Sequence, residues 1–203
     1  MRNKEFILIT GSSGKLGKTI CEIFAERGEN IIFHYFNSQE STNLLINKFN
    51  EKYKNVQFEK LRIDLSNLYS VHFFREKIFK KYQIKGLVNN ASIFVKDKEG
   101  VDSNFLNKNM NIHYRNPLAL ISCMVNSDVK GKFIINVTDI NLEQNGYHSY
   151  NKSKYLLSEF SKNMIGENTN LNIIEYKPGK ILPSKNAEKS LIKFKQEFKK
   201  LIE

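Results

Sequence analysis

Long apolar runs are absent from this chain of 203 residues. No segment approaches the roughly 20 apolar residues that a membrane-spanning helix requires. The first residues, Met1 to Glu5, carry charge and lead directly into a short strand-like segment, which is unlike a secretory signal peptide. We therefore expect a cytoplasmic protein with no signal peptide and no membrane partner.

Cysteine and proline are scarce, with two and three residues respectively. Cys21 and Cys123 fall on apolar faces of predicted helices and lack the spacing of metal ligands, so we expect buried, reduced thiols and no metal site. Internal repeats and low-complexity tracts are also lacking. The length suffices for one α/β domain with a substantial core, and we predict a single domain over residues 1–203.

Arginine-rich tracts and aromatic RNA-binding signatures are missing, although the formal net charge is +11. Lysines are spread over all the predicted helices and are balanced locally by glutamates. The densest stretch, 185–200, has the pattern of an ordinary amphipathic helix. We therefore expect no nucleic-acid partner, while the positive potential would help to gather small molecules that carry phosphate or carboxylate groups.

Strand-like and helix-like segments alternate along the chain, which predicts a parallel sheet covered by helices on both faces. The fold class is therefore α/β, with a doubly wound sheet of the Rossmann type. Ligands of such sheets bind beyond the carboxyl ends of the strands. The expected strands are 5–10, 30–36, 56–63, 85–90, 132–138 and 172–177, and the expected helices are 14–27, 40–53, 68–82, 103–127, 149–166 and 187–202.

A glycine-rich turn, 11–17, follows the first expected strand and opens directly into a helix. Glycine lets the backbone turn tightly and lets a pyrophosphate approach it, while the start of the helix offers unpaired N–H groups and the positive end of its dipole. The segment indicates a dinucleotide site. Taken alone it is only moderately specific, because any tight strand-to-helix turn favours glycine.

Four motifs occur in order: Thr-Gly-x-x-Gly-x-x-Gly at 10–17, Asn-Asn-Ala at 89–91, Tyr-x-x-x-Lys at 150–154 and Pro-Gly at 178–179. With this combination the chain resembles the short-chain dehydrogenase/reductase family from residue 5 to about 182. The resemblance implies an oxidoreductase that uses a nicotinamide cofactor. It also implies that the site residues follow the strand ends.

Tyr150 and Lys154 are one helical turn apart, so their side chains face the same way. The resemblance implies a joint task, in which the ammonium favours the phenolate and lowers the pKa of the tyrosine, so that the phenol exchanges a proton during hydride transfer. The same lysine would hold the hydroxyls of the nicotinamide ribose. A surface Tyr and Lys is the alternative, but the distance of the motif from the glycine-rich turn argues against it.

Asp139 stands where most of the family has a serine that binds the substrate carbonyl, and an aspartate there resembles the pteridine reductases. An ionised carboxylate only accepts hydrogen bonds, which suits the N–H groups of a pterin better than a neutral ketone. A carboxyl group can also support proton delivery to a ring nitrogen. Alternatively, Thr138 supplies the hydroxyl and Asp139 only caps a loop.

Counting back from Pro117 puts His113, rather than Asn111, at the position of the family's catalytic asparagine. The imidazole would replace the asparagine in a water-linked proton path, as we expect among members similar to dihydromonapterin reductase. A histidine that is satisfied within the helix packing is an equally good interpretation.

Phe94 lies two places beyond Ser92 in the loop after the fourth expected strand. The resemblance to pteridine reductases implies that an aromatic residue here lies over the pterin, which is held between it and the nicotinamide. Offset stacking of flat rings contributes about 1 kcal/mol beyond burial. The alternative is an aromatic residue that only anchors its loop.

Members of the family that use NAD place an acidic residue at the end of the second strand, and here no acid occurs before Glu40. Lys15, Asn37 and Ser38 can form a phosphate pocket, which favours NADPH. The resemblance implies that Asp64 binds the adenine amino group, although a helix cap is the alternative role. The expected cofactor contacts are Gly11, Ser13, Lys15, Leu16, Asn37, Ser38, Asp64, Leu65, Asn90, Ala91, Ser92, Tyr150, Lys154, Pro178 and Gly179.

The hypothesis from these residues is an NADPH-dependent reductase that transfers a hydride to a pterin, such as dihydromonapterin, dihydrobiopterin or dihydrofolate. One alternative is a carbonyl or 3-oxoacyl reductase of the same family. The expected catalytic residues are Asp139, Tyr150, Lys154 and His113, and the expected substrate contacts are Ser92, Phe94, Asp139 and Tyr150.

A second alternative is a non-catalytic module that binds the nucleotide. It is favoured by the end of the chain at Glu203, soon after one helix, because the family usually continues into a further strand. That end also weakens the case for a four-subunit assembly. A homodimer through the two long helices, 103–127 and 149–166, fits better.

Overall fold

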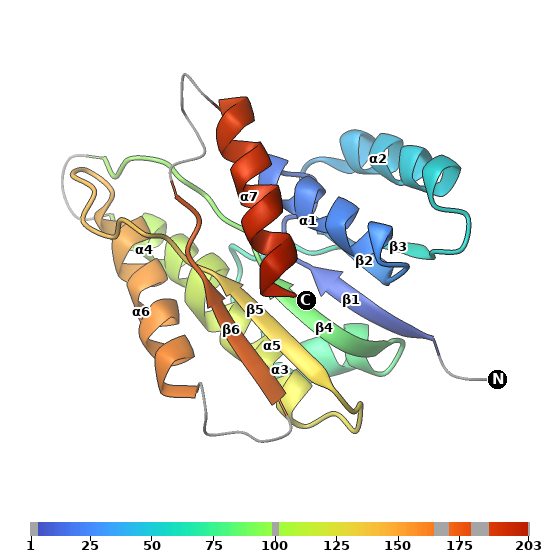
Figure 1. Cartoon of the computed structure of the whole chain (residues 1–203). Coiled ribbons are helices and arrows are strands. Elements are labelled where there is room, and N and C mark those ends of the chain that lie inside the picture. The colour runs from blue at the N-terminus through green and yellow to red at the C-terminus, as the bar shows by residue number, and fades with distance from the viewer. Residues whose placement is uncertain (1–3, 99–101, 165–170, 180–186, 203) are drawn as a thin grey trace.

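The computed structural model describes residues 4–98, 102–164, 171–179 and 187–202. These residues contain one six-stranded sheet with the order β3-β2-β1-β4-β5-β6, in which each neighbouring pair is parallel. The predicted doubly wound parallel sheet is confirmed, and the winding reverses between β1 and β4 (Figure 1). The strands are β1 (Glu5–Ile9), β2 (Asn30–Tyr35), β3 (Phe58–Arg62), β4 (Gln83–Asn89), β5 (Lys132–Val137) and β6 (Leu171–Tyr176).

Helices cover both faces of this sheet (Figure 1). One face carries α1 (Lys15–Glu26), α2 (Gln39–Lys52) and α7 (Ala187–Leu201). The other face carries α3 (Val71–Phe74), η1 (Arg75–Phe79), α4 (Ser103–Met110), η2 (Asn111–Arg115), α5 (Asn116–Val125) and α6 (His148–Met164). None of the helices in the described ranges combines the length and the apolar character needed to cross a membrane.

Two predicted helices differ from the structure. The expected helix 68–82 begins only at Val71, where the Ser70 hydroxyl accepts a hydrogen bond from the N–H of Phe73 at 3.1 Å, and it widens into a π-helical turn at Arg75. The expected helix 103–127 likewise contains the π-helical turn η2 between α4 and α5. The expected end of the helix 149–166 lies outside the described residues.

Alternating side chains along the strands divide the core into two layers. Ile7 and Ile9 of β1 pack with residues of α1, α2 and α7, whereas Leu8 packs with residues of α3, η1 and α5. Because both faces are covered, the central strands are buried on both sides. Cys21 and Cys123 are buried and unpaired, as expected.

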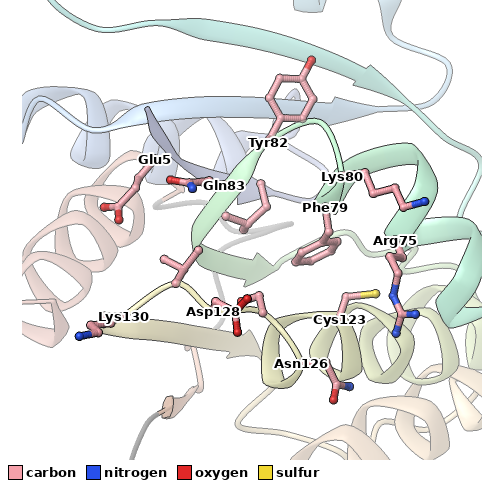
Figure 2. A pocket seen from close by; sticks show the side chains of 13 residues that line it. Glu5, Arg75, Phe79, Lys80, Tyr82, Gln83, Cys123, Asn126, Asp128 and Lys130 are labelled. Atoms are coloured by element: carbon pink, nitrogen blue, oxygen red, sulfur yellow. The ribbon is translucent and has the colours of Figure 1, made fainter. Parts of the chain in front are cut away.

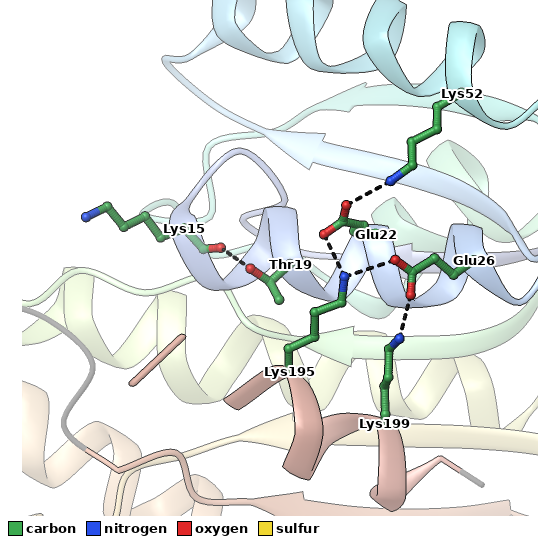
Figure 3. Close-up of polar contacts among 7 residues, drawn as sticks. All are labelled: Lys15, Thr19, Glu22, Glu26, Lys52, Lys195 and Lys199. Carbon is green, nitrogen blue, oxygen red and sulfur yellow. Dashed lines mark hydrogen bonds and ion pairs between the residues drawn. The ribbon is translucent and has the colours of Figure 1, made fainter. Parts of the chain in front are cut away.

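The helix α7 packs against α1 through two phenylalanines and a cluster of ion pairs. Phe194 and Phe198 are buried, and the ring of Phe198 meets that of Phe24 edge-on at 6.1 Å. Beside them, Lys195 of α7 lies 3.0 Å from Glu22 and 2.9 Å from Glu26 of α1 (Figure 3). These contacts hold the C-terminal helix beside the helix that follows the glycine-rich turn.

Candidate active site

The turn between β1 and α1 is fixed by the residues that follow β4. The Thr10 hydroxyl accepts hydrogen bonds from the N–H groups of Asn90 and Ala91 at 2.9 and 3.0 Å. The Asn90 side-chain amide donates in return to the carbonyls of Thr10 and Gly11 at 2.9 and 3.2 Å. The Asn-Asn-Ala motif therefore shapes the glycine-rich turn, a role that the sequence did not reveal.

The three glycines of the turn have different reasons to be glycine. Gly11 has φ +64°, and a Cβ there would lie 2.8 Å from the Cα of Ala91. At Gly17 a Cβ would lie 2.1 Å from the Gly11 carbonyl oxygen. Gly14 is exposed, and a Cβ there would meet no atom nearer than the Gly11 carbonyl oxygen at 3.5 Å. The packing of the chain therefore requires glycine at 11 and 17 but leaves space above Gly14.

His34 of β2 ties the glycine-rich turn to two neighbouring strands. The N–H of Gly11 donates to its Nδ1 at 3.1 Å, so Nε2 carries the proton and donates to the Ile63 carbonyl at 3.0 Å. Burial lowers the pKa of His34 to about 4, and the ring is neutral near pH 7. The sequence analysis did not predict a role for His34. The feature that could have indicated one is a polar side chain inside an otherwise apolar strand.

Stability should depend on pH through His34. The pKa of its ring falls from 6.5 to about 4 on folding, so the unfolded chain takes up the proton first as the pH drops. Stability should therefore decline between pH 6.5 and 4, by roughly 3 kcal/mol from this group, and His34→Gln should remove that part of the decline. Urea unfolding of both proteins at several pH values measures it. Equal pH slopes in the two proteins would contradict this assignment.

Asp139 and Tyr150 are in direct contact. Asp139 follows β5, Tyr150 is in the first turn of α6, and the phenol donates to the Asp139 carboxylate at 2.6 Å. Burial, and after it this carboxylate, raise the pKa of Tyr150 above its ordinary value. The phenol therefore keeps its proton near neutral pH.

Lys154 lies on the same helix as Tyr150 and contacts the end of β5. Its ammonium is buried and donates to the Val137 carbonyl at 2.7 Å. Burial lowers the pKa of Lys154 to about 8, against the opposing attraction of Asp139. The expected lowering of the Tyr150 pKa by Lys154 is thus not found in this arrangement, because burial and Asp139 act in the other direction.

His113 uses both of its ring nitrogens within the packing. The N–H of Ile93 donates to Nε2 at 3.1 Å, so the proton is on Nδ1 and is donated to the Ser153 hydroxyl at 2.8 Å. Burial, together with the charge of Lys154, lowers the pKa of His113 well below its ordinary value. The ring is a neutral link between the loop after β4 and α6, and its part in a proton path stays a prediction.

Asn111, the other candidate at this position, uses its side chain in contacts with Ser66 and Arg115. Its side-chain amide donates to the Ser66 carbonyl at 2.8 Å, and its oxygen accepts a hydrogen bond from Arg115 at 3.1 Å.

Asp64 stabilises the loop in which it lies, because its Oδ1 accepts a hydrogen bond from the N–H of Ser66 at 2.9 Å. An adenine contact of Asp64 stays a prediction beside this local role.

An aromatic group lies beside Tyr150. Phe94 stacks on Tyr147 with a centroid distance of 4.2 Å and an interplanar angle of 5°, and it meets Tyr150 edge-on at 4.9 Å. The Asp97 carboxylate accepts the N–H of Ser149 at 3.2 Å, which fixes the Phe94 loop to the start of α6. Phe94 is 38% exposed, so part of its ring is accessible. Tyr147 was not predicted as part of this group.

Thr138, the alternative source of a hydroxyl, is turned toward β6. Its side chain is buried, and the hydroxyl donates to the Glu175 carboxylate at 2.7 Å. Asp139 is therefore the polar side chain after β5 that contacts Tyr150.

The predicted residues gather at the carboxyl edge of the sheet. The Ser13 and Ser38 hydroxyls, from the turns after β1 and β2, are 2.6 Å apart. Figure 3 shows the Lys15 ammonium pointing away from the charges between α1 and α7. The others follow the strand ends or lie on the helices beside them: Gly11 and Leu16 after β1, Asn37 after β2, Asp64 and Leu65 after β3, Asn90, Ala91 and Ser92 after β4, Asp139 after β5, Pro178 and Gly179 after β6, His113 on η2, and Tyr150 and Lys154 on α6.

Two pockets lie at the opposite end of the sheet, where the strands begin. One, of about 560 Å³, is bordered by Glu5 and Gln83 at the amino ends of β1 and β4 (Figure 2). The other, of about 430 Å³, is bordered by Lys132 and Leu171 at the amino ends of β5 and β6. No predicted site residue lines either pocket. Since open α/β sheets bind ligands beyond the carboxyl ends, we place the candidate site at the glycine-rich turn.

Solved structures of similar fold include enzymes that act on different substrates. The FolM alternative dihydrofolate reductase 1 of Brucella suis, solved in complex with NADP, is 23% identical with a TM-score of 0.77, over 89% of this chain and 74% of that one. A bulky-bulky ketone specific alcohol dehydrogenase from Comamonas testosteroni is 17% identical with a TM-score of 0.79, over 99% of this chain and 85% of that one. These likenesses establish the fold.

Two sequence comparisons concern the family. The uncharacterized oxidoreductase YmfI of Bacillus subtilis strain 168 is 42% identical over 59 residues, which is 29% of this chain and 24% of that protein. The chain thus matches about a quarter of that relative. The family model described as short chain dehydrogenase matches residues 5–191. With this match over most of its length, the chain belongs to the short-chain dehydrogenase family.

Proposed function

We propose that this protein is an NADPH-dependent reductase that transfers a hydride to a pterin. The observation that carries the proposal is the 2.6 Å hydrogen bond from the Tyr150 phenol to the Asp139 carboxylate, with Phe94 beside the phenol. A proton donor (Tyr150), a hydrogen-bond acceptor (Asp139) and an accessible aromatic ring (Phe94) therefore lie together near the carboxyl ends of the strands. The name of the Brucella suis relative, a dihydrofolate reductase, supports the same substrate class.

The residues of the first turn fit a dinucleotide. The chain leaves space above Gly14, the start of α1 presents backbone N–H groups there, and Lys15 is exposed beside them. Solved relatives in complex with NADP or NADPH support this choice of cofactor. NADPH would supply the hydride, and Lys154 would hold its ribose.

Asp139 and Tyr150 would recognise the substrate and move its proton. Carboxylate oxygens accept hydrogen bonds, so Asp139 can bind the N–H groups of a pterin but gains nothing from a neutral ketone oxygen. The raised pKa of Tyr150 keeps its phenol protonated, which makes it a proton donor near neutral pH. Asp139 orients this phenol through their hydrogen bond.

Phe94 and Tyr147 would support the flat ring of the substrate. Their stacked rings form a rigid pair, and the loop that carries Phe94 is fixed by Asp97 to the start of α6. Stacking of a pterin on such a ring would contribute about 1 kcal/mol of binding free energy beyond that from burial of the ring. Positioning of the two reacting rings would supply most of the rate gain.

A carbonyl or 3-oxoacyl reductase is the second candidate function, favoured by the likeness to the ketone-specific dehydrogenase. Besides the Tyr150 phenol, a ketone oxygen would need a second neutral donor after β5, and the Thr138 hydroxyl at that place is held by Glu175. This contact argues for the pterin.

Asp139→Asn tests the proposed role of the carboxylate. We expect kcat/KM for a dihydropterin to fall by about 10²-fold, because an uncharged amide does not take up a proton and replaces one of the two acceptor oxygens by an NH₂ donor. NADPH affinity should stay within about twofold. Steady-state NADPH oxidation and fluorescence titration measure the two quantities.

Asp128→Asn is the matched control. Asp128 is an exposed carboxylate beside the pocket at the opposite edge of the sheet (Figure 2). This variant should keep wild-type kinetics. Equal kinetics in Asp139→Asn and wild type would refute the proposed role, and a gain for ketones alone would favour the second candidate.

We also propose a homodimer formed through the two long helical segments, 103–127, which comprises α4, η2 and α5, and 149–166, which contains most of α6. Tyr155 of α6 is 52% exposed, although it is large and aromatic. Aromatic residues are enriched in the cores of protein interfaces. Sedimentation of the purified protein tests this assembly.

A further inference from the structure

Arg62 ends β3 and lies beside the end of β2. Its Nε donates to the Phe36 carbonyl at 3.2 Å, and Tyr35 is its partner in the strand register. Along β3, Leu61 faces the core layer of α3 and α5, so Arg62 faces the side of α2. Lys60 confirms this direction, because its ammonium donates to Asn43 of α2 at 3.1 Å.

The end of β2 carries no charged basic side chain of its own. The segment from Phe33 to Ser38 has one basic residue, His34, whose buried ring is neutral. Among the ion pairs of the described residues, none includes Arg62 or Lys15. Ser38, which precedes the first turn of α2, lies against Ser13 of the glycine-rich turn. Arg62 and the paired hydroxyls of Ser13 and Ser38 therefore lie at the end of β2, and Lys15 follows Ser13 by two residues in the same turn. Neither cation has a carboxylate partner among the described residues.

We propose that Arg62 determines the cofactor specificity by binding the 2′-phosphate of NADPH, together with Lys15 and Ser38. The Phe36 contact uses Nε and fixes the plane of the guanidinium, so both Nη groups remain as donors. A planar fork of this kind matches phosphate oxygens and gives stronger hydrogen bonds than neutral donors. The inference rests on NADPH as cofactor in the proposed function and is independent of the pterin.

A purely structural role of Arg62 makes a different prediction. If the guanidinium only fastened β3 to the Phe36 carbonyl, its loss would loosen the end of β2 and weaken every adenine nucleotide alike. If it binds the phosphate, only ligands with a 2′-phosphate should suffer. The probes are therefore 2′,5′-ADP, which carries this phosphate, and ADP, which lacks it.

The test is calorimetric titration of both probes into wild type, Arg62→Gln and Arg62→Lys. We expect Arg62→Gln to raise the Kd of 2′,5′-ADP about tenfold or more and to change that of ADP less than about twofold. Arg62→Lys, which keeps the charge but not the fork, should lie between them. Lys60→Gln is the matched control on the same face of the same strand, and it should bind both probes like wild type.

Three outcomes would overturn the inference. An unchanged Kd of 2′,5′-ADP in Arg62→Gln, when wild type prefers it over ADP, would remove Arg62 alone and leave NADPH as the cofactor. Equal losses for both probes would give Arg62 the structural role. A wild type that does not prefer 2′,5′-ADP would contradict NADPH as the cofactor, and this inference with it.

Discussion

Tyr150→Phe should lower the turnover number by roughly 10²–10⁴-fold and leave NADPH affinity within about twofold. The substitution removes one oxygen atom, and with it the proton that the phenol holds 2.6 Å from Asp139. The ring itself stays packed edge-on against Phe94 and His113. Chemistry should therefore be lost without loss of the fold. Steady-state NADPH oxidation gives the turnover number, and fluorescence titration gives the affinity.

Tyr147→Phe is the control for this prediction. Tyr147 contributes its ring to the stack with Phe94, and phenylalanine preserves that ring. Its turnover should stay within about threefold of wild type, since stacking depends on the ring face and not on the hydroxyl. Undiminished turnover in Tyr150→Phe would reject the catalytic assignment. Absence of turnover in wild type as well would favour the non-catalytic nucleotide-binding module.

Gly17→Ala should destabilise the whole fold, whereas Gly14→Ala should impair only nucleotide binding. A Cβ at 17 would lie 2.1 Å from the Gly11 carbonyl oxygen, so the backbone of the turn would have to move. We expect a loss of about 3 kcal/mol or more in the free energy of unfolding, at the upper end of the usual cost of overpacking. Chemical denaturation measures this loss.

Gly14→Ala is the matched variant on the same turn. Its Cβ would make an ordinary contact at 3.5 Å, so stability should change by less than about 1 kcal/mol. The methyl group would instead occupy the space where a pyrophosphate would approach, and the Kd of NADPH should rise about tenfold or more. Normal NADPH binding by Gly14→Ala would contradict the placement of the cofactor. Wild-type stability of Gly17→Ala would contradict the packing of the turn.

The sheet could be predicted from the sequence because its strands are short apolar segments separated by amphipathic helices. The edge that carries the site followed from this order, since parallel strands bring their carboxyl ends to one side. The contact between Asp139 and Tyr150 was harder to foresee. It depends on how the loop between them folds, and the sequence defined only their separation.

Several site features could not be predicted because they are contacts between distant backbone groups and side chains. A histidine inside an apolar strand shows that something polar is buried, but not that His34 would bond Gly11 and Ile63. The preference of Lys154 for the Val137 carbonyl likewise depends on the position of β5 against α6. The position of Arg62 beside the end of β2 depends on the pairing of β3 with β2, which the sequence does not specify.

Helix interruptions also escaped prediction. The residues Asn111–Arg115 continue the apolar pattern of the helices on either side, so periodicity indicated one continuous helix. The π-helical turn changes which side chains face the site: His113 points to Ser153 and Asn111 to Ser66. An alignment by spacing alone therefore could not decide between the two residues.

The most direct test of the account is a comparison of substrates with the wild-type protein and NADPH. The values of kcat/KM are measured for dihydrobiopterin, dihydromonapterin, dihydrofolate and an acetoacetyl thioester under the same conditions. We predict that at least one of the pterin-containing substrates exceeds the thioester by about 10²-fold or more, because Asp139 matches ring N–H groups and not a carbonyl oxygen. A thioester that is reduced faster than all three would contradict the central claim.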